Sequence, residues 1–248
     1  MIIKEFQGFS GNQIYLVKGQ TAPFVRKTGS AVSIGRNVER LLALSQEFPV
    51  PEILSHTDTQ IDMEYIHGLD IKTYLIHYPC DHLINFITDV LERLSHNAVN
   101  KDYTDVYKRK LASMRWESDL PFGPQQLLDR LPKILPCSNY HGDFTLENII
   151  YTQDQGFYLI DCVTIEYDSY VFDIAKMRQD LDCGWFTRND AVMLDVKTHQ
   201  IQQQLLNRWP LADNDYILIL MLLRVYQYTR PHTAERDLLI RGINRLWK

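Results

Sequence analysis

The stretch His141-Gly142-Asp143-Phe144-Thr145-Leu146-Glu147-Asn148 decides how this chain is interpreted. Asp143 precedes Asn148 by five residues, and a second aspartate, Asp161, ends an apolar run further along the chain. A carboxylate can orient a hydroxyl and take its proton, and a magnesium ion prefers oxygen ligands from carboxylate and amide side chains. The three side chains are therefore candidates for proton transfer and for metal binding in a phosphotransferase.

Two short apolar runs and a polar turn lie between Asn148 and Asp161. They predict a β-hairpin over residues 149–160 that presents the two polar side chains next to each other. Taken singly, each of these polar residues also fits an ordinary position in a turn or at a strand end. Taken together, with Gly142 directly before Asp143, they favour a functional site.

The loop resembles the catalytic loop of kinases, and its His-Gly-Asp order is similar to that of the aminoglycoside phosphotransferase and choline kinase group. The resemblance implies an α+β, two-lobed protein kinase-like fold. We expect a small, β-rich N-lobe over residues 1–66 that binds the nucleotide. A larger, mainly helical C-lobe over residues 67–248 is expected to carry the catalytic loop, the metal site and the acceptor pocket.

The same resemblance implies the chemistry of the site. Asp143 would accept the proton of the acceptor hydroxyl, and Asn148 and Asp161 would hold Mg²⁺. ATP and Mg²⁺ are the implied cofactors. The implied phosphate acceptor is a hydroxyl of a small molecule, such as a sugar or another hydroxylated metabolite.

Two alternatives within the same fold stay open. A protein kinase would carry Arg in the middle of the His-Gly-Asp triplet and Asp-Phe-Gly at the metal position, where this chain has Asp161-Cys162-Val163, and no Ala-Pro-Glu follows. A non-catalytic pseudokinase would have lost a metal ligand or the phosphate-binding lysine. The chain retains candidates for all of them, so we favour a small-molecule kinase.

A glycine-containing turn follows the first predicted strand. Strands are expected at residues 2–6 and 14–17, and the resemblance places Ser10, Gly11 and Asn12 of the intervening turn above the ATP phosphates. Small residues allow backbone N–H groups to approach an anion. An ordinary hairpin turn is the alternative reading of this weak motif.

The third predicted strand supplies the phosphate-binding lysine. The resemblance implies that Lys27 contacts the α- and β-phosphates, although a register error of one residue would exchange it with Arg26. A helix is expected over residues 35–47, and its Glu39 is the implied partner of Lys27. The alternative for Glu39 is a surface residue that stabilises the start of the helix through its dipole.

Residues 60–66 alternate between polar and apolar and then meet Gly68, which predicts the last strand and the hinge. The resemblance implies that main-chain groups of Glu64 and Ile66 bind adenine. An ordinary edge strand is the alternative.

The second half of the chain is predicted to be helical, with helices at residues 83–94, 103–116 and 125–131. Asp173 resembles the family's helix-opening aspartate that braces the catalytic loop, so we expect it to be a structural support.

The charge balance of the last third of the chain bears on the phosphate acceptor. From Ile165 onward there are eleven Asp and Glu and eleven Lys and Arg, a balance that argues against a pocket for a polycation such as an aminoglycoside. Arg178, Trp185 and Arg188 are candidates to hold a sugar or an anionic acceptor by stacking and bidentate contacts.

The composition excludes several classes of protein. The chain of 248 residues is 45% hydrophobic, so it can bury a substantial core. A net charge of −5 argues against nucleic acid or an anionic membrane as partner. The four cysteines form no CxxC pair and are too sparse for a disulfide framework or a zinc cluster, so we expect reduced thiols. The start lacks the apolar core of a signal peptide, and residues 216–223 are too few to span a bilayer. We therefore expect a cytoplasmic protein, and no pattern in the sequence fixes an oligomeric state.

Overall fold

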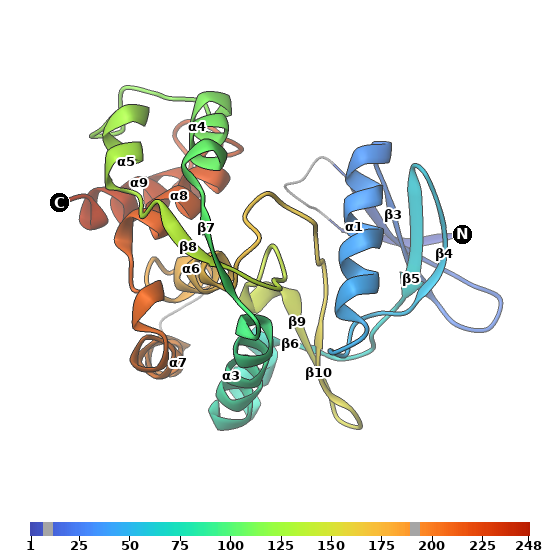
Figure 1. Ribbon diagram of the computed structural model, residues 1–248. Coiled ribbons are helices and arrows are strands. Elements are labelled where there is room, and N and C mark those ends of the chain that lie inside the picture. The colour runs from blue at the N-terminus through green and yellow to red at the C-terminus, as the bar shows by residue number, and fades with distance from the viewer. Residues whose placement is uncertain (7–11, 189–193) are drawn as a thin grey trace. The chain divides into compact units, whose positions relative to one another are not determined.

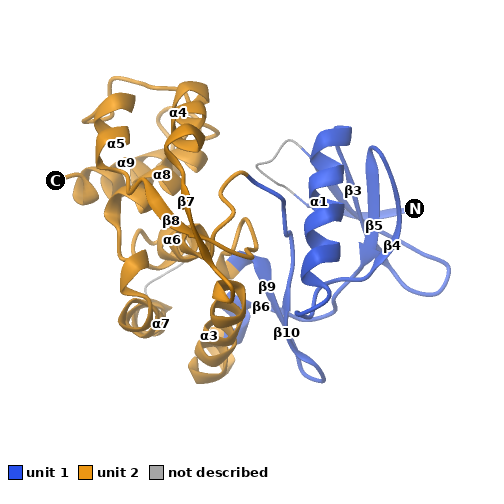
Figure 2. Ribbon diagram, viewed as in Figure 1, with its two compact units in different colours: residues 1–74, 147–165 blue, residues 75–146, 166–248 orange. Residues whose placement is uncertain are grey.

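The computed structural model describes residues 1–6, 12–188 and 194–248. The chain forms two compact units, residues 1–74 with 147–165 and residues 75–146 with 166–248 (Figure 2). The first unit therefore extends past the boundary expected at residue 66, and it also contains the hairpin that was expected in the C-lobe. The reason is packing within this unit, because Tyr74 lies 4.8 Å from Tyr151 and 5.1 Å from Phe157 between ring centroids.

The first unit contains an antiparallel sheet of five strands in the order β1-β2-β3-β5-β4 (Figure 1). Its strands are β1 (Ile2–Phe6), β2 (Gln13–Val17), β3 (Phe24–Thr28), β4 (Ile53–Thr57) and β5 (Gln60–Glu64). Helix α1 (Ala31–Leu44) begins four residues before its expected start, because the Ser30 side chain caps it by accepting a hydrogen bond from the Ser33 N–H. Apolar residues at helical spacing, among them Ile34, Val38 and Leu41, are buried.

A second sheet in this unit contains the predicted hairpin. Its strands are β6 (Leu69–Asp70), β9 (Ile149–Thr152) and β10 (Gly156–Leu159), all antiparallel, in the order β10-β9-β6. The hairpin prediction is confirmed. Helix α2 (Ile71–His77) follows β6 along the chain.

The second unit is mainly helical. Its described helices are α3 (Asp81–Ser95), α4 (Thr104–Ser113), α5 (Pro124–Arg130), α6 (Tyr170–Leu181), α7 (Asp195–Arg208), α8 (Asp215–Tyr226) and α9 (Ala234–Leu246). A two-stranded antiparallel sheet of β7 (Val99–Asp102) and β8 (Ile134–Cys137) was not predicted. The 3₁₀ turns η1 (Leu146–Asn148) and η3 (Pro210–Ala212) complete the elements used below.

The core of the second unit surrounds α6 and α8. Helix α6 is buried from Tyr170 to Asp180, and it packs against α8, which in turn packs against α9. The expected architecture, a small antiparallel sheet and a larger helical part, is confirmed. Of the helices that the structure describes, none combines the length and the apolar character needed to cross a membrane.

Candidate active site

The loop that contains Asp143, the candidate catalytic loop, is held by the amino-terminal end of α6. Asp173 in the first turn of this helix is 1% exposed; its Oδ2 accepts a hydrogen bond from the His141 N–H at 2.6 Å and its Oδ1 one from the Gly142 N–H at 2.9 Å. Burial raises the pKa of Asp173 to about 7, although the two backbone donors favour the ionised form. These contacts confirm that Asp173 braces the loop.

Gly142 gives the loop its sharp change of direction. Its φ of 95° lies in the left-handed region, where a residue with a Cβ atom is strained. Glycine at this position therefore lets the chain turn sharply between His141 and Asp143 without strain.

Asp143 is paired with a lysine of α6. Lys176 Nζ lies 2.9 Å from Asp143 Oδ1, and the lysine side chain is 7% exposed whereas that of Asp143 is 32% exposed. Burial acts to raise the pKa of Asp143, but the charges of Lys176 and Arg224 and the hydrogen bond from Lys176 outweigh it and lower this pKa. Asp143 is therefore an ionised carboxylate at neutral pH, as an acceptor of a proton must be.

One stripe of α6 holds the loop at three points. Asp173, Lys176 and Asp180 follow each other at intervals of three and four residues, so they share a face of the helix. Asp180 Oδ2 accepts a hydrogen bond from the Leu146 N–H at 2.7 Å. The sequence analysis missed Lys176 and Asp180, although polar residues at helical spacing within an apolar helix were a readable signal.

In the first unit, Lys27 is the centre of a second cluster. It is 4% exposed, and its Nζ donates to Asp161 Oδ1 at 2.5 Å and to Asn37 Oδ1 at 2.7 Å. Arg26 lies on the other face of β3, where it donates to both carboxylate oxygens of Asp62 at 2.8 and 2.7 Å. The register therefore points Lys27, and not Arg26, toward α1 and Asp161.

The expected pairing of Lys27 with Glu39 is wrong. In the described part of the chain the helical partner of Lys27 is Asn37, whose amide also donates to the Ser33 carbonyl at 2.8 Å. Asn37 lies on the buried face of α1, and Glu39 is exposed. Two positions along a helix turn a side chain by roughly 200°, so both residues cannot face β3.

The two expected metal ligands lie at one end of the hairpin. The Asn148 carbonyl accepts a hydrogen bond from the Ile160 N–H at 3.0 Å, and Asp161 follows directly with a left-handed φ of 55°. Strained backbone of this kind is concentrated at functional sites. The Asp161 side chain is 41% exposed, so it is accessible to an ion.

The donor set fits magnesium. Mg²⁺ is usually held by one or two protein carboxylates together with phosphate oxygens and water, and a carboxylate with a neighbouring amide oxygen suits that chemistry. The described residues contain no group of three or more His, Cys, Asp and Glu that suits a metal ion held by protein ligands alone.

The expected phosphate-covering turn is described only at its end. Ser10 and Gly11 lie outside the described residues. The Asn12 side chain is hydrogen-bonded to the Ser33 hydroxyl at 2.9 Å, which ties the end of this turn to the first turn of α1. A Cβ atom at Gly29 would lie 2.0 Å from Asn12 Oδ1, so glycine is required there for this contact.

The expected hinge follows β5. The Glu64 N–H donates to the Glu52 carbonyl at 2.9 Å, so this N–H is already used within the fold. Ile66 lies two residues further and is 9% exposed. The adenine contacts of Glu64 and Ile66 stay predictions.

The expectation that Arg178 and Trp185 contact an acceptor is wrong. Arg178 is 4% exposed and donates to Asp182 at 2.8 Å and to Asp215 at 3.2 Å, so its charge is used within the fold. Trp185 is 3% exposed, and Arg188 lies 4.4 Å above its ring. A count of charges along the sequence cannot distinguish buried ion pairs of this kind from a binding surface.

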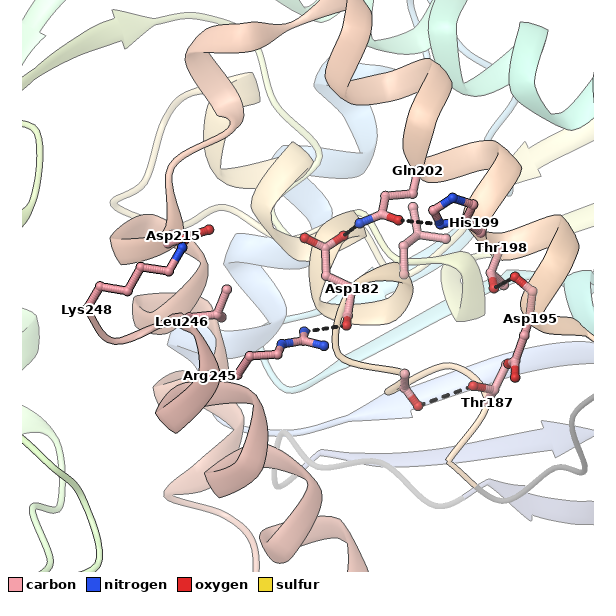
Figure 3. Close-up of a pocket in the computed structure, with 12 residues that line it drawn as sticks. Asp182, Thr187, Asp195, Thr198, His199, Gln202, Asp215, Arg245, Leu246 and Lys248 are labelled. Atoms are coloured by element: carbon pink, nitrogen blue, oxygen red, sulfur yellow. Dashed lines mark hydrogen bonds and ion pairs between the residues drawn. The ribbon is translucent and has the colours of Figure 1, made fainter.

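A pocket of about 610 Å³ lies at the carboxyl-terminal end of α6 (Figure 3). Asp182, His199, Gln202 and Arg245 are among its lining residues. Asp173, which braces the catalytic loop, lies at the opposite end of the same helix. This pocket is therefore not the place where an acceptor would meet Asp143.

Comparisons with solved structures show the same fold. The aminoglycoside phosphotransferase APH(4)-Ia is 11% identical (98% of this chain and 92% of that chain, TM-score 0.65). A putative fructosamine-3-kinase from Haemophilus somnus is 12% identical (99% and 90%, TM-score 0.65), and Plasmodium vivax ethanolamine kinase is 12% identical (98% and 81%, TM-score 0.58). A thermostable mutant of APH(4)-Ia, 9% identical (98% and 92%, TM-score 0.61), has been solved with AMP-PNP and hygromycin B.

The sequence itself carries a family signature. No curated protein matches it. The profile of the phosphotransferase enzyme family matches residues 3–205, which include both clusters described above. The chain therefore belongs to the phosphotransferase enzyme family.

Proposed function

We propose that this phosphotransferase transfers the γ-phosphate of ATP, with Mg²⁺, to a hydroxyl of a small molecule. The observation that carries the proposal is Asp143, an accessible carboxylate on a loop that Asp173 braces, and Lys176 pairs with it and lowers its pKa. The solved structures with this fold include an aminoglycoside phosphotransferase and an ethanolamine kinase, and one was solved with AMP-PNP.

The residues of the second unit would act on the acceptor. Asp143 orients the acceptor hydroxyl and takes its proton as the bond to phosphorus forms. Lys176 keeps Asp143 charged, and the hydrogen bonds to Asp173 keep the loop from moving when the proton is transferred. A fixed carboxylate needs little reorganisation during the reaction, which lowers the barrier.

The residues of the first unit would act on the nucleotide. Lys27 binds phosphate oxygens, and Asn37 keeps its ammonium group in position. Asn148 and Asp161 would hold Mg²⁺, which neutralises charge on the phosphates when it is bound. For this, Asp161 gives up its hydrogen bond with Lys27, which frees the lysine for phosphate. Backbone groups of Ser10, Gly11 and Asn12 would cover the phosphates, and those of Glu64 and Ile66 would hold adenine.

The direct test is a turnover assay with ATP, Mg²⁺ and a panel of sugars, nucleosides, amino alcohols and hydroxy acids. ADP release that requires one acceptor, with a matching phosphorylated product, is the expected result. Binding of ATP without turnover on any acceptor, or labelling of protein instead of small molecules, would contradict the proposal. Asp143→Asn is the negative control, and it must bind ADP as the natural protein does.

A further inference from the structure

A buried phenol without a hydrogen-bond partner lies at the start of α6. Tyr167 is 3% exposed, and within the described residues its hydroxyl has no hydrogen-bond partner. Its ring packs against Phe172 with 4.8 Å between centroids, so the side chain cannot easily rotate toward water. A buried donor of this kind is costly unless a ligand or a water molecule accepts from it.

A guanidinium group covers this tyrosine. Arg224, in the last turn of α8, lies with its Cζ 5.6 Å from the centre of the Tyr167 ring. Its Nη1 donates to the sulfur of Met221 at 3.3 Å, which is a weak acceptor for a charged donor. Across the described ranges, Arg224 makes no ion pair.

A lysine of α4 faces the same place. Lys110 follows Tyr107 by three residues, so the two share a face of the helix, and the Tyr107 ring lies 6.3 Å from that of Phe172. Burial lowers the pKa of Lys110, and the positive charge of Arg224 lowers it further. Lys110, too, makes no ion pair in the part of the chain that the structure describes.

Among the described residues, the nearby carboxylates form their ion pairs with other cations than Lys110 and Arg224. Glu166 raises the pKa of Lys110, but its own ion pair, at 3.6 Å, is with Arg109. Asp168 is paired with Lys101 at 2.6 Å. Two cations that repel each other, next to a phenol hydroxyl that lacks an acceptor, are typical of a site that binds an anion.

Arg224 also acts on the candidate catalytic base. Its charge contributes to the lowered pKa of Asp143, so the guanidinium belongs to the same electrostatic environment as this carboxylate. Lys176 contacts Asp143 directly. An anion held by Arg224 and Lys110 would thus be part of a molecule whose hydroxyl reaches Asp143.

We propose that the phosphate acceptor carries an anionic group, a carboxylate or a phosphate, and that Lys110, Tyr167 and Arg224 bind it. These three residues are called the anion subsite. The inference rests on the proposed function for the transfer itself and adds the chemical class of the acceptor. Arg224 supplies paired donors, Lys110 supplies a point charge and Tyr167 supplies a neutral O–H donor.

A purely structural role explains only part of this arrangement. Stacking of Arg224 on the Tyr167 ring is a common cation–π contact that stabilises a fold. It leaves the phenol hydroxyl without an acceptor, and it gives no reason to place Lys110 against Arg224. An acceptor with an amino group would add a third positive charge at this place.

Binding of inorganic phosphate tests the anion subsite without turnover. The full chain is saturated with ADP and Mg²⁺, so that the nucleotide site is filled, and phosphate is titrated at constant ionic strength by calorimetry. We expect Arg224→Gln and Lys110→Gln each to weaken phosphate binding by about tenfold or more. The matched control is Lys108→Gln on the same helix, whose lysine is 57% exposed, and it should leave binding unchanged. Equal phosphate affinity in all four proteins would overturn the proposal.

Matched acceptors then test the substrate class. Glucose, glucosamine, gluconate and glucose 6-phosphate are compared by ADP release, because they share a carbon skeleton and differ in charge. We expect one of the two anionic compounds to have the highest kcat/KM, and the better one identifies carboxylate or phosphate as the preferred group. Arg224→Gln should raise KM for that compound by about tenfold or more with kcat within about threefold. Preference for glucose or glucosamine, unaffected by Arg224→Gln, would overturn the proposal.

The two proposals fail separately. If none of the acceptors is phosphorylated but phosphate binding still depends on Arg224 and Lys110, the anion subsite stands and the proposed transfer fails. If an uncharged acceptor is phosphorylated and phosphate does not bind, the transfer stands and the subsite fails. Circular dichroism of each variant shows whether it is folded. If either Arg224→Gln or Lys110→Gln fails to fold, the other variant still tests the anion subsite.

Discussion

The two clusters of candidate catalytic residues are built in different ways. In the second unit, Asp143 belongs to a loop that buried side chains of α6 hold through backbone and side-chain contacts. In the first unit, Asp161 has a left-handed backbone, a side chain that is 41% exposed, and a hydrogen bond to the lysine that would bind phosphate. In the proposed mechanism the Asp143 cluster is fixed in advance, whereas the Asp161 cluster would exchange partners when nucleotide and metal bind.

The largest expected effect is at Asp143. Asp143→Asn removes the proton acceptor and leaves the buried bracing of the loop in place, so kcat should fall by roughly 10²- to 10⁴-fold. The dissociation constant for ADP should stay the same. The matched control is Asp105→Asn on α4, whose carboxylate is 81% exposed and which should leave kcat unchanged. Near-normal turnover of Asp143→Asn would show that Asp143 is not the proton acceptor, although its loop is held rigidly.

A smaller effect is expected on the nucleotide side. Asn37→Ala removes a hydrogen bond to the charged Lys27 and should lower kcat/KM for ATP by about ten- to a hundredfold. Glu39→Ala, on the exposed face of the same helix, should change it by less than about twofold. A larger loss of kcat/KM in Glu39→Ala than in Asn37→Ala would support the pairing of Lys27 with Glu39 that the sequence suggested.

The pH dependence of kcat/KM sharpens the comparison at Lys176. In Lys176→Met the charge that opposes burial is gone, so the pKa of Asp143 rises and the acid limb of the profile moves to higher pH. Activity at pH 6 should therefore fall more than activity at pH 8. Lys176→Arg, which keeps the charge, should restore the acid limb. An unchanged acid limb in Lys176→Met would mean that the lysine has only a packing role.

The last expected effect is on stability and not on turnover, and it involves Asp173. Its pKa is about 7 in the folded protein, against 3.8 as the ordinary value. Well below pH 3.8 this carboxyl group is protonated in both states, and as pH rises toward 7 the unfolded state loses the proton first. The free energy of unfolding, relative to Asp173→Asn, should therefore decrease between pH 4 and 7 by at most about 4 kcal/mol. Urea unfolding at several pH values measures it, and a difference that is constant with pH would contradict the raised pKa.

The sequence predicted those parts of the site that depend on local spacing. The loop, the hairpin and the strand with Lys27 could be read because strands alternate faces and the loop motif lies within eight residues. Asn37 was missed because its direction depends on how α1 is rotated against β3. The difference between Asn37 and Glu39 is one of burial, which the local pattern did not reveal.

Long-range partners were the least predictable part. Lys176 and Asp180 lie more than thirty residues from the loop that they hold, and their pairing appears only after α6 has packed. The same holds for Arg178, which was expected to contact an acceptor and instead forms ion pairs with Asp182, Asp213 and Asp215. The sequence gives the number of charged side chains, and the fold determines which of them form ion pairs with each other.

The central claim is that Asp143, Asn148 and Asp161 act on one metal-bound nucleotide and its acceptor. A crystal structure of the protein with AMP-PNP and Mg²⁺ tests it most directly. We predict Mg²⁺ at about 2.1 Å from oxygens of Asn148 and Asp161. Lys27 should have left Asp161 for a phosphate oxygen, and Asp143 should face the γ-phosphate. Mg²⁺ bound without either residue, with the Lys27–Asp161 pair intact, would contradict the account.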